Sequence, residues 1–213
     1  RLHEPAIQPN IMNGIPASRR ASSIEYAIRD VVVPAMELER KGHDLIKLNI
    51  GDPLSYPGLP TPSHMVDAFK QALERQDNGY GPSYGIEDLR EAIAKDERSK
   101  GWDCRSDDVY VTHGVTEALQ VLFAAFLEQG DTILAPGPHY PPYMAYPQMY
   151  GAKTVEYALD SDQGWDIDTD DIRRKMNDTV KFIVIVNPNN PTGNVAKPST
   201  LSLIHISEPT RRT

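Results

Sequence analysis

Cysteine is almost absent from this sequence of 213 residues, in which Cys104 is the only one. A single cysteine cannot form a disulfide within the chain, and this fits a reducing compartment. No cluster of His or Cys surrounds Cys104, so we interpret it as a structural thiol rather than a nucleophile or a metal ligand. The sequence therefore predicts neither a disulfide scaffold nor a metal site.

Long hydrophobic runs and an excess of positive charge are also missing. The longest apolar run, Phe182–Val186, is far shorter than the roughly 20 residues that cross a bilayer. No basic stretch followed by an apolar one opens the sequence, so no signal peptide is expected. The formal charge of −8 disfavours binding to nucleic acid or to anionic membranes. Together these absences favour a soluble, cytoplasmic protein.

The hydrophobic periodicity predicts helices that alternate with strands. Helical spacing over residues 22–41 is interrupted by Pro34, which predicts a kinked helix or two helices. Further helices are expected at 63–74, 86–100, 116–128, 142–150 and 168–176, and strands at 45–50, 109–112, 132–135, 154–157 and 181–186. This alternation indicates an α/β fold, with a mainly parallel sheet and helices on both of its faces.

A loop of asparagines and prolines follows the last predicted strand, with the sequence Asn-Pro-Asn-Asn-Pro-Thr-Gly over residues 187–193. Ligands of α/β proteins bind outside the carboxyl ends of strands, so the loop lies where a site is expected. The prolines fix backbone φ, and the asparagine amides can donate hydrogen bonds into a pocket. An ordinary turn is the alternative, but seven residues in this order fit it poorly.

A strand, a glycine turn and a helix start follow one another over residues 112–119. Free N–H groups and the positive end of a helix dipole suit a phosphate group. Gly114 allows close approach of the backbone, and the Thr116 hydroxyl adds a donor. The alternative is that Thr116 is a plain N-cap.

An aromatic and proline-rich segment, residues 136–143, follows another predicted strand. Its prolines hold the chain in fixed turns and present Tyr140 as a rigid aromatic plate. The alternative is a tyrosine of the core or of an interface, and this is our interpretation of Tyr143. His113 and His139 show no ligand spacing and are interpreted as non-catalytic.

These motifs resemble those of class I/II aminotransferases, which are pyridoxal-phosphate-dependent enzymes of fold type I. Segments 49–53 and 80–93 add to the resemblance, which comes nearest to the alanine aminotransferase-like branch. It implies that Gly114, Val115 and Thr116 bind the cofactor phosphate. Tyr140 would stack on the pyridine ring, and Asn190 would donate a hydrogen bond to its phenolic oxygen.

Two further roles follow from the same resemblance. Tyr80 would reach the cofactor phosphate of a neighbouring subunit, which implies a homodimer. Gly51 would let the substrate carboxylate approach the backbone. The implied activity is transfer of an amino group between an amino acid and a 2-oxo acid. A C–S lyase, a cyclopropane-forming synthase or a non-catalytic aminotransferase-like module are the alternatives.

The catalytic residues of the family are not found in this sequence. The family needs a lysine that forms a Schiff base with the cofactor, in a Ser-x-x-Lys segment after the Asn-Pro loop. Lys197 follows that loop too early to match, and no other lysine fits. The resemblance therefore predicts a truncated fold type I domain and an inactive fragment of an active parent enzyme.

The resemblance also predicts how the chain is divided. Residues 1–60 would form an N-terminal arm and part of the small domain, and residues 61–201 the first half of the large, cofactor-binding domain. Residues 202–213 continue no helical or strand pattern and resemble translated sequencing-adapter sequence. We expect native sequence to end near Leu201.

Overall fold

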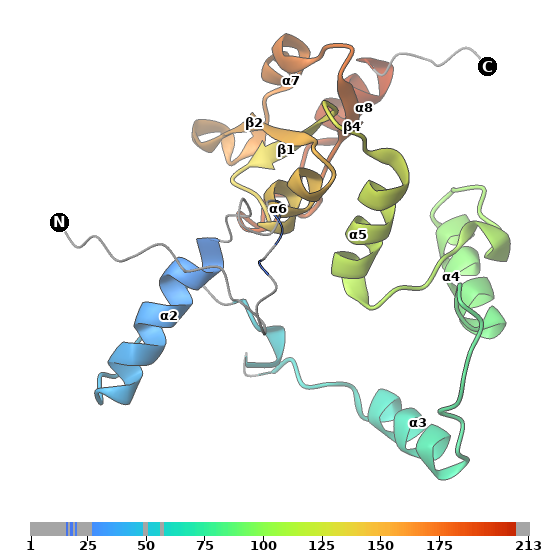
Figure 1. The fold of residues 1–213 in the computed structure, drawn as a ribbon. Helices are drawn as coiled ribbons and strands as arrows, with labels where there is room; N and C mark the ends of the chain where they lie inside the picture. The colour runs from blue at the N-terminus through green and yellow to red at the C-terminus, as the bar shows by residue number, and fades with distance from the viewer. Residues whose placement is uncertain are drawn as a thin grey trace. The chain divides into compact units, whose positions relative to one another are not determined.

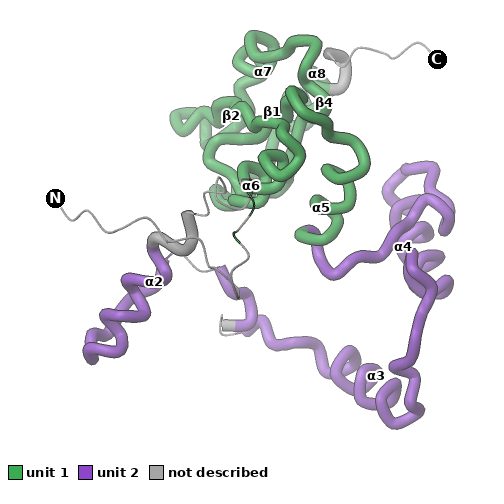
Figure 2. The backbone as a smooth tube through the Cα atoms, in the orientation of Figure 1, with its two compact units in different colours: residues 1–30, 116–213 green, residues 31–115 purple. Residues whose placement is uncertain are grey.

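The structure is a computed structural model that describes Pro16, Ser18, Arg20 and residues 27–48, 51–55 and 58–207. The chain falls into two compact units, and Figure 2 shows them in different colours. Unit 1 contains residues 1–30 and 116–213, and unit 2 contains residues 31–115. The domain limits expected from the sequence stay a prediction.

A four-stranded sheet with the order β3-β2-β1-β4 organises unit 1. Figure 1 labels three of its strands, β1, β2 and β4. Its strands are β1 (Thr132–Gly137), β2 (Lys153–Asp160), β3 (Asp166–Ile167) and β4 (Val180–Ile183). The central strand β1 pairs in parallel with both β2 and β4, whereas β3 runs antiparallel to β2. The predicted mainly parallel sheet is therefore confirmed.

Four helices pack on this sheet, two on each face. They are α5 (Gly114–Phe126), α6 (Pro142–Met149), α7 (Thr169–Lys175) and α8 (Pro198–Ser207). Successive side chains of a strand point to opposite faces, so a strand buried on both sides is apolar throughout. Residues 132–136 of β1 are all buried, as this arrangement requires. The predicted covering of both faces is confirmed.

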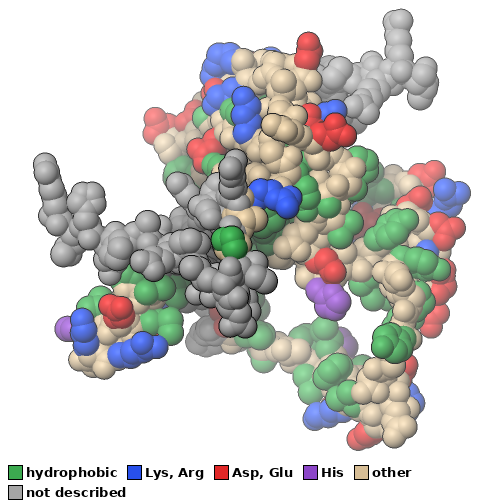
Figure 3. Space-filling model, viewed as in Figure 1, with side chains coloured by type: hydrophobic (Ala, Val, Ile, Leu, Met, Phe, Trp, Pro, Cys, Tyr) green, Lys and Arg blue, Asp and Glu red, His purple; other side chains and the backbone are tan. Residues whose placement is uncertain are grey.

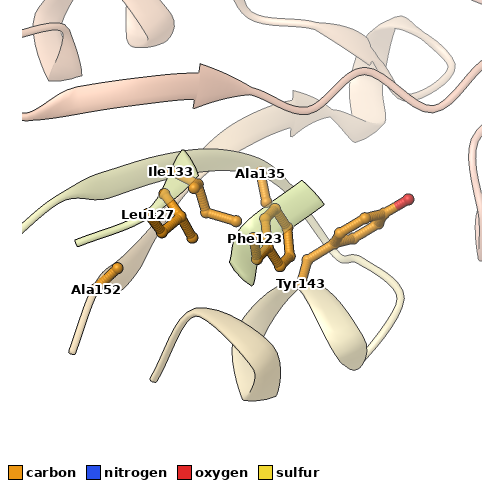
Figure 4. Close-up of a cluster of buried hydrophobic side chains, with 6 residues drawn as sticks. All are labelled: Phe123, Leu127, Ile133, Ala135, Tyr143 and Ala152. Carbon is orange, nitrogen blue, oxygen red and sulfur yellow. The ribbon is translucent and has the colours of Figure 1, made fainter. Parts of the chain in front are cut away.

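One face of the sheet carries α5 and α6. Ile133 and Ala135 of β1 pack there with Phe123 of α5 and Tyr143 of α6, and Leu127, just after α5, completes the layer (Figure 4). Burying each large side chain stabilises the fold by about 1.5–3 kcal/mol. This layer holds the start of α6 close to the end of β1.

The opposite face carries α7 and α8. Leu134 of β1 and Tyr157 of β2 pack there with Ile172 of α7 and Ile204 of α8. The Tyr157 hydroxyl is buried too, and it donates a hydrogen bond of 2.8 Å to the carbonyl of Val184. Burial raises the pKa of this hydroxyl, so it stays a donor at neutral pH.

Unit 2 consists of helices and irregular segments. Its elements are the larger part of α2 (Ala27–Arg40), η1 (Pro53–Ser55), α3 (Ser63–Glu74), α4 (Glu87–Ser99) and η2 (Ser106–Asp108). The predicted helices at 63–74 and 86–100 are confirmed. Pro34 lies inside α2 rather than dividing it, and the expected start of that helix at 22–26 lies outside the described residues.

Two predicted strands are wrong. Residues 109–112 and 45–48 have extended sequences but form no strand, and 49–50 lie outside the described residues. A strand needs a neighbour to satisfy its backbone groups, and Val111 instead donates its N–H to the Tyr84 carbonyl. Ile46 and Leu48 are 89% and 92% exposed, so residues 45–48 pack on no sheet.

Two smaller predictions also need correction. The sequence predicts that Leu89, Ala92 and Ile93 form the buried face of α4. Leu89 and Ala92 are exposed and Ile93 is half-buried, whereas Arg90 and Ala94 are the buried residues. Residues 202–213 were expected to continue no helical or strand pattern, but residues 202–207 belong to α8, in which Ile204 is buried. The origin of residues 202–213 stays a prediction.

Candidate functional site

The candidate site lies where two neighbouring parallel strands end. β1 and β4 are adjacent in the sheet, and their carboxyl ends lead into the loops that carry Tyr140 and Asn190. From β1 the chain passes to β2 on one side and later to β4 on the other. Ligands of open α/β sheets bind at such a reversal of strand order. The topology thus brings the two predicted loops to one edge of the sheet.

The first turn of α5 reaches the loop that follows β1. The Thr116 hydroxyl lies 3.3 Å from the Tyr140 hydroxyl, so the two groups share a hydrogen bond. Thr116 is the third residue of α5, which begins at Gly114, and the alternative that it is the N-cap is therefore wrong. This contact joins two residues predicted from separate motifs, 24 positions apart in the chain.

Gly114 shapes the turn that opens α5. Its φ of +73° lies in the left-handed region, which glycine adopts without a steric penalty. Its N–H donates to the Thr112 carbonyl at 2.8 Å, and the Thr112 hydroxyl donates back to the Gly114 carbonyl at 3.0 Å. Val115 follows and is exposed. The predicted phosphate-binding residues 114–116 thus form one helical turn beginning at a fixed glycine.

The ring of Tyr140 is half-buried and held by its neighbours. It meets the Tyr143 ring edge-on, at 6.0 Å between centroids and 82° between planes. His139 lies with Nδ1 3.0 Å from the Tyr140 carbonyl and Nε2 3.1 Å from Glu156 Oε1. Burial, and then the nearby Tyr140, raise the pKa of the Tyr143 hydroxyl. Tyr143 is a core residue, as expected, and His139 contacts the backbone of the aromatic loop.

Hydrogen bonds within the Asn-Pro loop fix its shape. The Asn189 N–H donates to the Asn194 carbonyl and the Gly193 N–H to the Asn189 carbonyl, both at 2.8 Å. The Asn189 side chain donates to Thr192 Oγ1 at 2.9 Å, and Asn187 Oδ1 accepts from the Ala196 N–H at 3.0 Å. These bonds close a compact turn at whose tip Asn190 is exposed.

Asn189 leaves one buried acceptor without a partner. The residue is 7% exposed, and its Oδ1 accepts no hydrogen bond from the described residues. An unpaired buried carbonyl is costly, and such atoms gather where a ligand or water completes the structure. The loop next to Asn190 thus has spare hydrogen-bonding capacity, in keeping with a binding site.

The remaining predicted residues belong to unit 2. Gly51 is exposed, and it precedes η1. Tyr80 has a fully exposed side chain in the segment between α3 and α4. Their roles toward substrate and cofactor stay predictions. Lys197, rejected as the catalytic lysine, forms an ion pair with Asp166 in unit 1, at 3.3 Å.

The described part of the chain shows neither a metal-binding cluster nor a membrane-spanning helix. No group of three or more His, Cys, Asp or Glu side chains in that part could hold a metal ion. None of its helices has the length and apolarity needed to cross a lipid bilayer.

Comparison with known proteins decides the family. A model of the family "Aminotransferase class I and II" matches residues 43–207. The chain belongs to the class I and II aminotransferases. These enzymes depend on pyridoxal phosphate. The residues present fit that cofactor: the Thr116 hydroxyl and the start of α5 suit the phosphate, and the half-buried Tyr140 suits the ring.

Named aminotransferases are among the relatives. The chain is 38% identical to the glutamate-pyruvate aminotransferase AlaA of Haemophilus influenzae, over 86% of this chain and 46% of that protein. It is 37% identical to an alanine aminotransferase of Mycobacterium tuberculosis, over 84% of this chain and 42% of that protein. The chain therefore spans about half the length of the curated relatives it matches.

Solved aminotransferase structures share this half of the fold. An alanine aminotransferase from Pyrococcus furiosus is 51% identical, with a TM-score of 0.82 over 87% of this chain and 47% of that one. A Thermus thermophilus aspartate aminotransferase variant is 32% identical, with a TM-score of 0.81 over 89% of this chain and 49% of that one. The fold type I assignment is thereby confirmed.

The structure also contains contacts that sequence reasoning missed. Asn194 Nδ2 donates to the Trp165 carbonyl at 2.9 Å, and the Thr200 hydroxyl donates to Asp166 Oδ2 at 3.1 Å. The first contact joins the segment after β4 to the turn before β3, and the second joins α8 to β3 itself. A strand of two residues gives no periodic signal, so only the Gly164-Trp165 pair marks this turn in the sequence.

Proposed function

We propose that the protein containing this chain transfers amino groups between an amino acid and a 2-oxo acid with bound pyridoxal phosphate. In this proposal the chain supplies one side of the cofactor site. The observation that carries it is the 3.3 Å contact between the Thr116 and Tyr140 hydroxyl groups, within a chain of this family. It unites the predicted phosphate turn with the predicted ring contact.

Each residue has a role that follows from its chemistry. The start of α5 has a positive dipole end and a hydroxyl at Thr116, and both favour a doubly charged phosphate. Tyr140 would orient the ring by aromatic contact, worth on the order of 1 kcal/mol beyond area burial. An amide N–H of Asn190 would hold the phenolic oxygen in its ionised form, because hydrogen bonds to a charged group favour that charge.

The chemistry itself depends on groups from both halves of the parent protein. Bound pyridoxal phosphate supplies the electron sink that accepts the electron pair released at the amino acid α-carbon. The reactive lysine, the aspartate at the pyridine nitrogen and the arginine for the substrate carboxylate would come from the second half. The residues of this chain bind and orient, and Gly51 would leave room for the carboxylate.

The relatives favour the reversible transfer of an amino group from glutamate to pyruvate, which gives 2-oxoglutarate and alanine. Two proteins named for these substrates are 37–38% identical to the chain, and the Pyrococcus alanine aminotransferase is 51% identical. We also place the enzyme in the cytoplasm as a homodimer, with Tyr80 contributing to the partner's site. The full exposure of the Tyr80 side chain leaves its hydroxyl available for that role.

A chimaera tests the proposal. Residues 1–201 would replace the corresponding half of the Pyrococcus furiosus alanine aminotransferase, which supplies the second half. We expect transamination of alanine with 2-oxoglutarate, and a loss of cofactor affinity of about tenfold or more in Thr116→Ala, from one charge-assisted hydrogen bond. Tyr80→Phe should weaken cofactor binding similarly.

Other outcomes would decide between the alternatives. A folded chimaera that binds cofactor but eliminates thiol from cysteine derivatives instead of transaminating would favour the C–S lyase. A folded chimaera that neither binds cofactor nor turns over substrate would contradict the proposal and favour a non-catalytic module. Circular dichroism and thermal unfolding would establish folding in each case.

A further inference from the structure

The turn between β2 and β3 lies against the Asn-Pro loop and has an unusual backbone. η3 (Ser161–Gln163) ends β2, and two left-handed residues follow, Gly164 with φ +69° and Trp165 with φ +65°. Glycine adopts this conformation freely, but a bulky aromatic residue does so only when its surroundings require it. The strain at Trp165 therefore needs an explanation.

The backbone contacts of Trp165 explain its left-handed conformation. The Trp165 N–H donates to the Asp160 carbonyl at 2.7 Å, which ties the turn to the end of β2. The Trp165 carbonyl accepts a hydrogen bond of 2.9 Å from the Asn194 side-chain amide. The left-handed conformation thus directs one carbonyl to the loop that carries Asn190.

Asp166, the next residue, makes a second connection to the same segment. Its carboxylate accepts from the Thr200 hydroxyl at 3.1 Å and lies 3.3 Å from the Lys197 ammonium group. Burial alone would raise the pKa of this carboxyl. Hydrogen bonds from the Ile167 N–H, Lys197 and Thr200 outweigh burial and lower it. The carboxylate is charged at neutral pH and ties the start of α8 to β3.

Asn194 also closes the loop from inside. Its carbonyl accepts the Asn189 N–H, and the Asn189 carbonyl accepts the Gly193 N–H. A displacement of Asn194 would therefore loosen the turn at whose tip Asn190 is exposed. Trp165 lies in the turn between η3 and β3 and directly precedes Asp166 of β3, so the hydrogen bond connects the loop to the end of the sheet.

We propose that Asn194 is a positioning residue, which holds the Asn190 loop in its binding conformation through the Trp165 carbonyl. Asp166 supports this role by anchoring Lys197 and Thr200, which follow Asn194 in the chain. The inference rests on the proposed function, because it assumes that Asn190 contacts the cofactor ring. The carbonyl of Trp165, and not its indole, performs this role.

Amide hydrogen exchange of the 213-residue chain tests the positioning without any ligand. Asn194→Asp keeps the size of the side chain but removes the donated N–H. We expect the Asn189 and Gly193 amides to exchange about tenfold faster, the effect of losing one hydrogen bond. The Ile133 and Leu134 amides of β1 should stay unchanged. Unchanged exchange in the loop, or an equal increase in β1, would overturn the inference.

Two further variants sharpen the test. Trp165→Asn keeps the backbone carbonyl, and asparagine tolerates the left-handed conformation. The exchange rates of the loop amides should therefore stay within about twofold of those in the unchanged chain. Faster loop exchange in that variant would show that the indole matters and would contradict the role of the carbonyl. Gln163→Ala changes an exposed residue of η3 and should have no effect on the loop.

Binding of pyridoxine phosphate, which lacks the aldehyde and cannot react with lysines, separates the two proposals. Asn194→Asp should bind it at least about fivefold more weakly than the unchanged chain. Equal affinity would overturn the positioning role. If the unchanged chain does not bind the probe at all, one side of the site is not enough for binding. The chimaera then tests the proposed function, and the exchange rates alone decide whether Asn194 holds the loop.

Discussion

Arg90 of α4 is charged and yet only 4% exposed. Its Nε donates to the carbonyls of Ser106 and Val109, Nη1 to Glu87, and Nη2 to Ser106 and Asp107. The guanidinium carbon also lies 4.5 Å from the centre of the Tyr84 ring. A buried charge is tolerated only with such complete pairing. Arg90 therefore anchors α4 to η2.

Removing this side chain should destabilise unit 2. Arg90→Ala leaves buried carbonyls without donors, and we expect a loss of about 3 kcal/mol in the free energy of unfolding. Urea unfolding, followed by Trp102 fluorescence in a Trp165→Phe background, measures it. Arg98→Ala, which breaks an exposed pair with Glu91, is the control and should cost under about 1 kcal/mol. Equal losses would contradict the anchoring role.

Asp171 of α7 makes the stability of the fold depend on pH. Its carboxylate accepts from the Lys175 ammonium at 2.6 Å, from the Ala158 N–H of β2 at 2.8 Å and from Arg174 at 3.0 Å. The bond from Lys175 first, and then those from Ala158 and Arg174, outweigh burial and lower the pKa of the carboxyl below its ordinary 3.8. Asp171 thus stabilises the fold above that value, and the contribution disappears as pH falls below it.

Asp171→Asn should therefore be costly only at neutral pH. At pH 7 we expect a loss of about 2 kcal/mol, typical of hydrogen bonds to a charged group. Thermal unfolding at pH 7 and near pH 2.5 checks this. The difference in stability between Asp171→Asn and the unchanged chain should be smaller near pH 2.5. Asp170→Asn, whose side chain is 74% exposed, is the control. A difference that persists at low pH would contradict the assignment.

The sequence predicts single residues unevenly. Gly114, Thr116, Tyr140 and Asn190 stand in motifs whose order along the chain carries the information. Arg90 stands in a motif as well, but its burial was not foreseen, because its carbonyl partners lie 16 and 19 positions away. Pairing over such separations depends on the tertiary fold, which periodicity does not encode.

At the scale of elements, helices and central strands were predictable and edge features were not. The amphipathic pattern of α3 and the apolar run of β1 are local properties, and both elements were found where expected. Residues 109–112 have strand-like composition but no neighbouring strand to pair with, so they stay irregular. β3 has two residues and was missed, since it exists only by pairing with β2.

Gly85 controls the entry into α4. Its φ of +106° is unfavourable for other residues, and a Cβ there would lie 2.5 Å from Val111 Cγ2. Gly85→Ala should therefore cost about 3 kcal/mol in the stability of unit 2, from conformational strain and the clash together. Gly101→Ala, with φ +97° and no described atom within 4 Å, is the matched control for strain alone. Urea unfolding followed by Trp102 fluorescence compares them, and equal costs would rule out the clash.

At the scale of the whole molecule, many apolar side chains stay exposed. Figure 3 shows hydrophobic side chains among the charged ones on the surface. Ile46 and Leu48 are almost fully exposed, and Phe69 and Phe126 are 67% and 60% exposed. α3 has no buried residue at all. Exposed apolar surface of this extent marks sites of association.

The isolated chain should consequently bind hydrophobic dyes and self-associate. We expect anilinonaphthalene sulfonate fluorescence to rise severalfold on adding the chain, and light scattering to show species larger than a monomer at micromolar concentration. Replacing Phe69 and Leu73 of α3 by serine should reduce both signals. A chain that stays monomeric and does not raise the fluorescence of the dye would contradict this prediction.

We propose that Thr116, Tyr140 and Asn190 surround one cofactor molecule. Nuclear magnetic resonance of the nitrogen-15-labelled chain during titration with pyridoxine phosphate tests it most directly. We expect saturable shifts confined to the amides of the α5 start, the segment after β1 and the Asn-Pro loop. Saturable shifts in some other part of unit 1, with these three segments unchanged, would contradict it.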